Sequence, residues 1–132
     1  MKRRDQMEAV SLEMLVKEGH QYRRFLDIFD FGLVEVRLSA IEIYQNGYGI
    51  MRLFKCLLLQ FMENLSDREL ERYLEDSNAA KLFCGFSLSE KTPDYSLFCK
   101  VRKRVGVELL SSIYEELRGQ LRSKGYMSEV FT

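Results

Sequence analysis

The sequence predicts an all-α protein, a compact bundle of several helices with a helix-turn-helix-like element. Leu, Glu, Lys and Arg dominate the 132 residues, whereas there is a single proline and there are few valines or threonines, a balance that favours helices over strands. Apolar residues make up 46% of the chain and charged residues 30%, as in folded globular proteins. Apolar side chains recur three and four residues apart along most of the chain, which indicates amphipathic helices.

The length predicts one domain. We expect residues 1–10, which are polar and charged, to be disordered, residues 11–125 to form the helical domain, and residues 126–132 to be a short tail. The 20 basic and 20 acidic side chains cancel, so the chain is not a polybasic binder. A local basic face remains compatible with nucleic-acid binding, because the local field decides such contacts.

The first third of the chain predicts three short elements and then a loop. A short helix or turn is expected between Ser11 and Gly19, and a second helix from His20 to Phe29. The apolar side chains of the second helix lie on one face and are Tyr22, Phe25, Leu26 and Phe29. A third short helix, favoured over a strand by its helical neighbours, is expected over 33–43, before a turn at 46–49.

The clearest predicted helix begins at Ile50. Large apolar side chains form one stripe along it over four turns, and they are Ile50, Leu53, Phe54, Leu57, Leu58, Phe61, Met62 and Leu65. Burying each such side chain stabilises a fold by roughly 1.5–3 kcal/mol. We therefore expect this helix to form the centre of the core.

The next helix is predicted to be acidic and to begin at a capping box. Ser66 and Glu69 have the spacing in which each side chain binds the backbone amide of the other residue, and Leu70, Tyr73 and Leu74 form the inner face. From Glu63 to Asp76 there are six carboxylates against two arginines. We interpret them as a solvated outer face rather than as metal ligands.

Three further helices complete the prediction. A short one is expected over 78–84, ended by Gly85. Another begins after Pro93, with Asp94 as its N-cap, and its inner face is predicted to be Leu97, Phe98, Val101 and Val105. The last one runs over 107–124 with its apolar face on Leu110, Ile113, Tyr114, Leu117 and Leu121.

The basic helix that begins at Asp94 carries the strongest chemical signal. Four bases stand near its end, Lys100, Arg102, Lys103 and Arg104. Lys100, Lys103 and Arg104 share one side, where they would suit a phosphate backbone or a DNA groove, whereas Arg102 flanks the apolar stripe. An ordinary solvated helix face is the alternative, and the residues alone leave both interpretations open.

Other chemistries have little support in the sequence. His20 is the single histidine and is expected at a helix start or on the surface, so His-based triads and metal sites lack residues. Cys56, Cys84 and Cys99 lack zinc spacing and are expected to be reduced thiols in a cytoplasmic protein. Phosphate-binding glycine motifs do not occur. We expect no membrane span, because the longest apolar stripe is interrupted by charged and polar residues.

Several blocks in order resemble the N-terminal domain of bacterial insertion-sequence transposases of the DDE type, in particular the IS-five-like family. The blocks are Leu57-Leu-Leu-Gln60, Leu65-Ser-Asp-Arg-Glu-Leu-Glu71, Phe83-Cys-Gly-Phe86, Pro93-Asp-Tyr-Ser96 and Lys100-Val-Arg-Lys-Arg-Val-Gly106. The chain departs from the family pattern at Leu97, where the family usually has Thr, and at Val101, where it often has Phe. Neither departure touches the basic residues.

The resemblance implies that the helical domain binds the terminal inverted repeats of double-stranded DNA during transposition. It also implies that catalysis belongs to a subsequent RNase H-like domain, in which three carboxylates hold two metal ions. Residues 126–132 resemble the lead-in to that domain, and no residue here, Glu129 included, matches a catalytic carboxylate. We therefore expect a fragment truncated before the catalytic domain, with no enzyme activity and no cofactor of its own.

Two alternatives remain open on the sequence. The chain could be a helical module that forms homo-oligomers or inhibits full-length transposase by pairing with it, with the last helix making the contact. It could also be an inert remnant whose apolar surface once packed against the catalytic domain.

Overall fold

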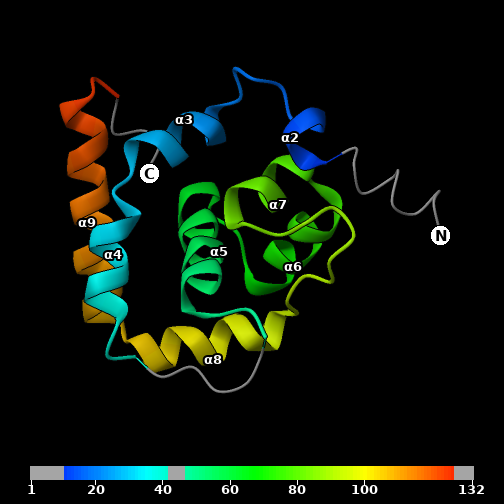
Figure 1. The fold of residues 1–132 in the computed structure, drawn as a ribbon. Coiled ribbons are helices and arrows are strands. Elements are labelled where there is room, and N and C mark those ends of the chain that lie inside the picture. The colour runs from blue at the N-terminus through cyan, green and yellow to red at the C-terminus, as the bar shows by residue number, and fades with distance from the viewer. Residues whose placement is uncertain (1–10, 42–46, 127–132) are drawn as a thin grey trace.

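The computed structural model describes residues 11–41 and 47–126 and is helical throughout its regular structure, which confirms the predicted all-α class (Figure 1). The predicted disordered N-terminus and residues 127–132 lie outside the described residues. The helices within them are α2 (Leu12–Leu15), α3 (Gln21–Ile28), α4 (Phe31–Leu38), α5 (Ile50–Glu63), α6 (Asp67–Asp76), α7 (Asn78–Cys84), α8 (Tyr95–Val105) and α9 (Val107–Ser123).

Helix α5 lies at the centre of the fold, and the other helices surround it (Figure 1). As predicted, Leu53, Phe54, Leu57 and Leu58 are buried. The predicted stripe is nevertheless too narrow, because Cys56 and Leu59 are buried as well. Contacts with α6, α7 and α8 cover more than one side of α5, whereas Phe61 near its end is 37% exposed.

Helices α4 and α9 lie side by side along one flank of α5, and α8 crosses below them (Figure 1). Hydrogen bonds join the flank: Arg37 Nη2 donates to Ser112 Oγ at 2.6 Å, and the Asp30 amide donates to Gln120 Oε1 at 2.8 Å. Helices α6 and α7 occupy the opposite side of α5 (Figure 1). The long helices α5, α8 and α9 thus form a frame on which the shorter helices pack.

The short N-terminal helices agree with the prediction, with shifted bounds. Phe25 and Phe29 are buried, as the spacing predicted. Helix α4 begins two residues before the predicted start, because Asp30 caps it by accepting the Leu33 amide at 3.0 Å. The predicted end of that helix lies beyond the described residues.

Serine caps begin both α6 and α7. The predicted capping box is present, since the Glu69 amide donates to Ser66 Oγ at 3.1 Å and the Ser66 amide donates to Glu69 Oε1 at 2.8 Å. Ser77 ends α6 and also caps α7, where its hydroxyl accepts the Ala80 amide. A single residue therefore joins α6 to α7, whereas residues 85–94 separate α7 from α8.

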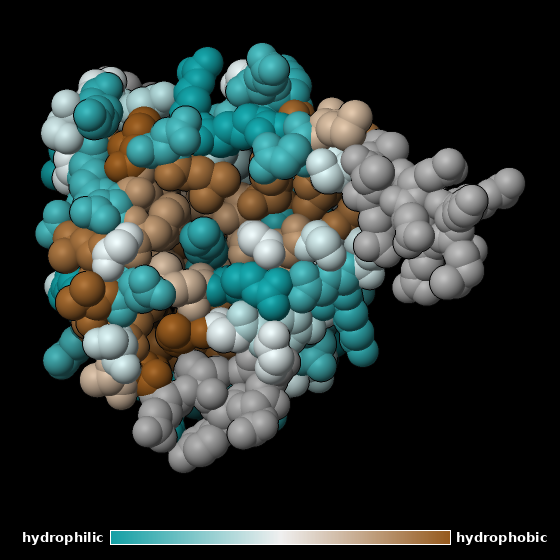
Figure 2. All heavy atoms as spheres, in the orientation of Figure 1, coloured by the Kyte–Doolittle hydropathy of each residue, from teal (hydrophilic) through white to brown (hydrophobic). Residues whose placement is uncertain are grey.

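Polar side chains rim the face seen in Figure 2, and apolar surface gathers below α3, between α4 and α7. Among the described residues, no helix is both long enough and apolar enough to span a bilayer.

Candidate nucleic-acid interface

Helix α8 begins at a strongly capped residue, as the sequence predicted. Asp94 Oδ1 accepts the amides of Ser96 at 3.0 Å and Leu97 at 3.3 Å, and it also accepts the Ser96 hydroxyl at 2.7 Å. These bonds, first among them the one from the Ser96 hydroxyl, hold the pKa of Asp94 below its usual range. Thr92 and Pro93 are buried just before the cap, so both the start and the direction of α8 are fixed.

The inner face of α8 determines which bases point outward. Phe98, Val101 and Val105 are buried against the core. Lys100 and Lys103 stand on the opposite side of the helix, and both are exposed, as is Arg104 beside them. Because residues four, seven and eight positions apart share one side of a helix, Ser96 and these three bases form one outer face of α8.

Arg102 does not belong to that outer face. Its guanidinium forms a bidentate ion pair with Asp67 on α6, with Nη1–Oδ1 at 2.6 Å and Nη2–Oδ2 at 2.8 Å, and it also donates to Gln60 Oε1 at 3.0 Å. The hydrogen bond from Arg102 is the main reason that the pKa of Asp67 lies below its usual range. Of the four predicted contact residues, the structure thus brings three together and ties the fourth to its own fold.

A second contact between α6 and α8 lies two turns earlier on α8. Glu71 Oε1 accepts the Tyr95 amide at 2.7 Å, at the first residue of the helix. The guanidinium carbon of Arg68 lies 3.9 Å from the centre of the Tyr95 ring, within the range of a cation–π contact. Helix α6 therefore contacts α8 near both ends of α8.

These contacts correct the expectation that the α6 carboxylates form a uniform solvated face. Asp67 and Glu71 are turned toward α8 instead, and the Asp67 side chain is only 24% exposed. Sequence reasoning missed them, and Gln60, as supports of the basic helix. The available signal was the spacing of Asp67 and Glu71, which stand one turn apart and so share a side of α6.

An open cavity of about 560 Å³ lies beside the first half of α8. Its lining includes Lys100 and Lys91 but also the carboxylates of Glu71, Glu75 and Asp94. Since carboxylates repel phosphate, the electrostatics favour an anionic ligand nearer the second half of α8, where Lys103 and Arg104 lie.

The remaining candidate groups are structural. His20 caps α3 by accepting the Tyr22 amide at its Nδ1, at 3.0 Å, in agreement with the predicted helix start. The three thiols are free; Cys56 and Cys84 are buried and Cys99 is half-buried. Within residues 11–41 and 47–126, no group of three or more potential metal ligands is found.

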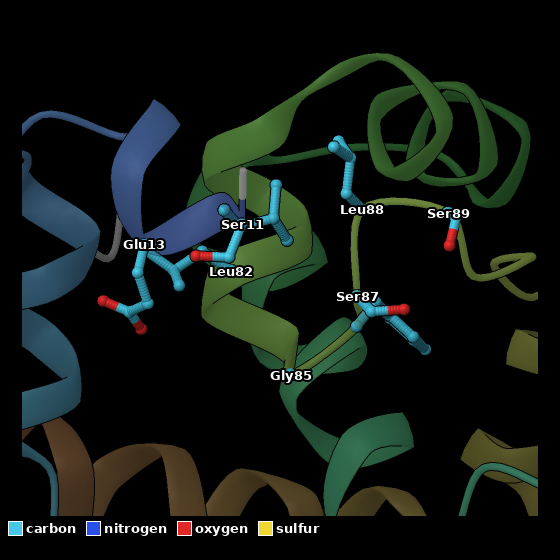
Figure 3. A pocket seen from close by; sticks show the side chains of 9 residues that line it. Ser11, Glu13, Leu82, Gly85, Ser87, Leu88 and Ser89 are labelled. Atoms are coloured by element: carbon cyan, nitrogen blue, oxygen red, sulfur yellow. The ribbon is translucent and has the colours of Figure 1, made fainter. Parts of the chain in front are cut away.

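A second cavity, of about 330 Å³, opens between α2, α7 and the loop after α7 (Figure 3). The side chains that line it are mostly apolar or carry hydroxyl groups (Figure 3). Glu13, the ionisable residue in its lining, pairs with Arg23 at 2.8 Å. The cavity therefore offers no chemistry comparable to that of α8.

Comparison with known proteins identifies the family. Residues 10–104 match the transposase domain family DUF772. The match spans most of the chain, from the start of α2 to Arg104, the last basic residue of α8, and leaves α9 outside. Searches of curated proteins and of solved structures returned no match. On the family match, the chain belongs to the transposase domain family DUF772.

Proposed function

We propose that this chain is a DNA-binding domain of a bacterial insertion-sequence transposase of the DDE type, similar to the IS-five-like family, and that it binds the terminal inverted repeats of its element. The observation that carries the proposal is the outer face of α8, which exposes Lys100, Lys103 and Arg104 opposite a buried apolar face. A transposase must recognise the ends of its element, and a rigid basic helix is a common device for such recognition.

The local charge supports α8 over α6 as the DNA-contacting helix. Three exposed bases on one side of α8 can each neutralise a phosphate. The outer residues of α6 include Glu69, Glu75 and Asp76, which would repel the DNA backbone. Helices α6, α7 and α8 together would act as the helix-turn-helix-like element, with α8 entering or flanking the groove.

Strand cleavage is proposed to lie outside this domain. The resemblance to DDE transposases supports this proposal, because it implies that the metal-binding carboxylates belong to an RNase H-like domain, which would act together with this one in cis or in trans. The chain mixed with divalent metal and DNA is therefore expected to bind the duplex without cutting it.

The test is binding to the inverted repeat of the element from which the gene comes, compared with a scrambled duplex of the same length and composition. Affinity should be higher for the inverted repeat and should fall as salt rises, with a slope of log K against log salt of about −0.9 for each phosphate contact. Equal affinity for both duplexes with no salt dependence would contradict the proposal.

A specific observation favours one alternative, a helical module that pairs with another transposase chain. Val107 at the start of α9 is 75% exposed, and it borders an apolar groove of about 380 Å³ in which Phe61 stacks on Tyr114. Sedimentation decides between the two functions. A strict monomer that binds DNA supports the DNA-binding domain, and a stable dimer that does not bind DNA supports the pairing module.

A further inference from the structure

We propose that the contacts between α6 and α8 orient α8, and that Asp67 is a positioning residue that keeps Arg102 away from DNA. The inference rests on the proposed DNA-binding function and adds to it a control of sequence discrimination. It assigns a role to the two carboxylates that the charge pattern had grouped with the solvated face.

Helix α6 is attached to α8 at two points. Asp67 binds Arg102, and Glu71 binds Tyr95. The two carboxylates stand one turn apart on α6, and their partners stand two turns apart on α8.

The ion pair of Arg102 and the contact of Arg68 with the Tyr95 ring both involve side chains of α8 that share one side of the helix. They therefore fix the rotation of α8 about its axis, and with it the direction in which Lys100 and Lys103 point.

The Arg102 attachment is the more specific of the two. Both Asp67 oxygens receive an N–H group of Arg102, and Gln60 joins the cluster by donating its Nε2 to Asp67 Oδ1 at 2.7 Å. A bidentate pair holds both planar groups in one geometry. Three helices, α5, α6 and α8, thus meet at a single guanidinium.

The same pair neutralises a positive charge that lies beside the outer face of α8. The Arg102 side chain is 36% exposed and stands directly before Lys103, so that an unpaired guanidinium would lie within reach of phosphate. Paired with Asp67, it adds no net charge. A released Arg102 guanidinium would strengthen binding to every duplex alike, because phosphate contacts carry no sequence information. Asp67 therefore favours discrimination over affinity.

The experiment uses the full 132-residue chain and two probes. One duplex is selected from a random-sequence pool by the unmodified protein, and the other is its scrambled counterpart. Affinities are measured at several salt concentrations for Asp67→Asn, Arg102→Gln and the double variant. Asp76→Asn is the matched control, since it removes one carboxylate from the exposed end of the same helix.

We expect Asp67→Asn to raise affinity for the scrambled duplex by roughly threefold to tenfold and to steepen the salt slope by about 0.9, the value of one added phosphate contact. The ratio of affinities for the selected and scrambled duplexes should fall by a similar factor. The double variant should lose the gain, because it lacks the released guanidinium. Asp76→Asn should keep the slope and the ratio of the unmodified chain.

Hydrogen exchange tests, in the absence of DNA, whether the contacts with α6 hold α8 in place. Amides of α8 should exchange faster in Asp67→Asn, whereas those of α9 beyond its first turn should be unchanged. If circular dichroism shows that Asp67→Asn does not fold, Arg102→Lys replaces it, because lysine keeps the charge but cannot form the bidentate pair. The expected direction of each change is the same.

The outcomes separate this inference from the proposed function. If the unmodified chain selects no duplex and shows no salt-dependent binding, both fail. If it binds normally and Asp67→Asn behaves like Asp76→Asn, the proposed role of Asp67 is overturned and the proposed DNA-binding function stands. A gain that persists in the double variant overturns that role as well, since the gain would not come from Arg102.

Discussion

Arg102 and Lys103 are neighbours in the sequence and carry the same formal charge, yet their surroundings differ. Lys103 is exposed on the outer face of α8, whereas Arg102 is bound to Asp67 and Gln60. One residue along a helix turns a side chain by about 100°, since an α-helix has 3.6 residues per turn. That rotation is enough to make one base a candidate DNA contact and the other a structural link.

The ion pair predicts a pH dependence of stability. The pKa of Asp67 in the folded protein is lowered by Arg102, so the stabilisation is fully present above the pKa of the unfolded chain, near 3.8, and is lost as pH falls through the lower folded value. Urea unfolding between about pH 5 and pH 2 should show a smaller loss of stability in Asp67→Asn than in the unmodified chain.

Arg102→Gln serves as the control for that measurement, because it removes the guanidinium and leaves the carboxylate in place. It should also weaken the acid dependence. If neither variant alters the fall in stability over the same acidic range, the pair does not exist in solution.

At the scale of the element, caps and apolar spacing predicted helices and their starts well. Ser66 and Asp94 cap α6 and α8 as expected, because capping depends on residues only two or three positions apart. The side on which a charged residue lands could not be predicted in the same way. Asp67 reaches Arg102, 35 residues away, and such a pairing depends on how two helices pack rather than on local spacing.

The burial of apolar side chains also depends on helix packing that local spacing does not predict. The apolar stripe predicted the inner face of α5 but not the burial of Cys56 and Leu59, because a stripe predicts one covered side and α5 is covered on several. Asp30 caps α4, so that this helix begins before the predicted start at residue 33. The same residue types occur at breaks and at caps, so Asp30 alone could not distinguish the two.

The Asp94 cap predicts the effect of its removal on α8. Asp94→Ala should destabilise the protein by about 1 kcal/mol, since a lost N-cap typically costs 0.5–2 kcal/mol. Chemical denaturation measures the difference. Asp94→Ser, which can still accept the amides, should recover most of it, and equal losses in both variants would show that the cap contributes little.

For the whole molecule, the 20 basic and 20 acidic side chains sum to zero, but α6 carries five carboxylates against two arginines, whereas α8 carries four bases and no carboxylate. Long-range attraction to DNA is therefore expected to be weak, and the proposed binding would depend on how the core holds the basic helix. The core is formed around α5, where Phe54 is 1% exposed. The position of the proposed interface and the stability of the fold are consequently expected to be linked.

Truncation at the centre of the core tests that dependence. Phe54→Ala should lower the free energy of unfolding by about 3–5 kcal/mol, the usual cost of emptying a buried aromatic position. Val36→Ala, at a side chain that is 70% exposed, should have little effect. Comparable small effects in both variants would show that α5 is not the centre of the core.

The most direct test of the central claim, that the outer face of α8 binds DNA, is a charge reversal. Lys103→Glu combined with Arg104→Glu should abolish salt-dependent binding to the inverted repeat while far-UV circular dichroism stays unchanged. The matched control is Arg122→Glu with Lys124→Glu, two exposed bases at the end of α9, which makes the same change in net charge and should keep most of the affinity. Equal losses in both variants, or full binding by the α8 variant, would contradict the account.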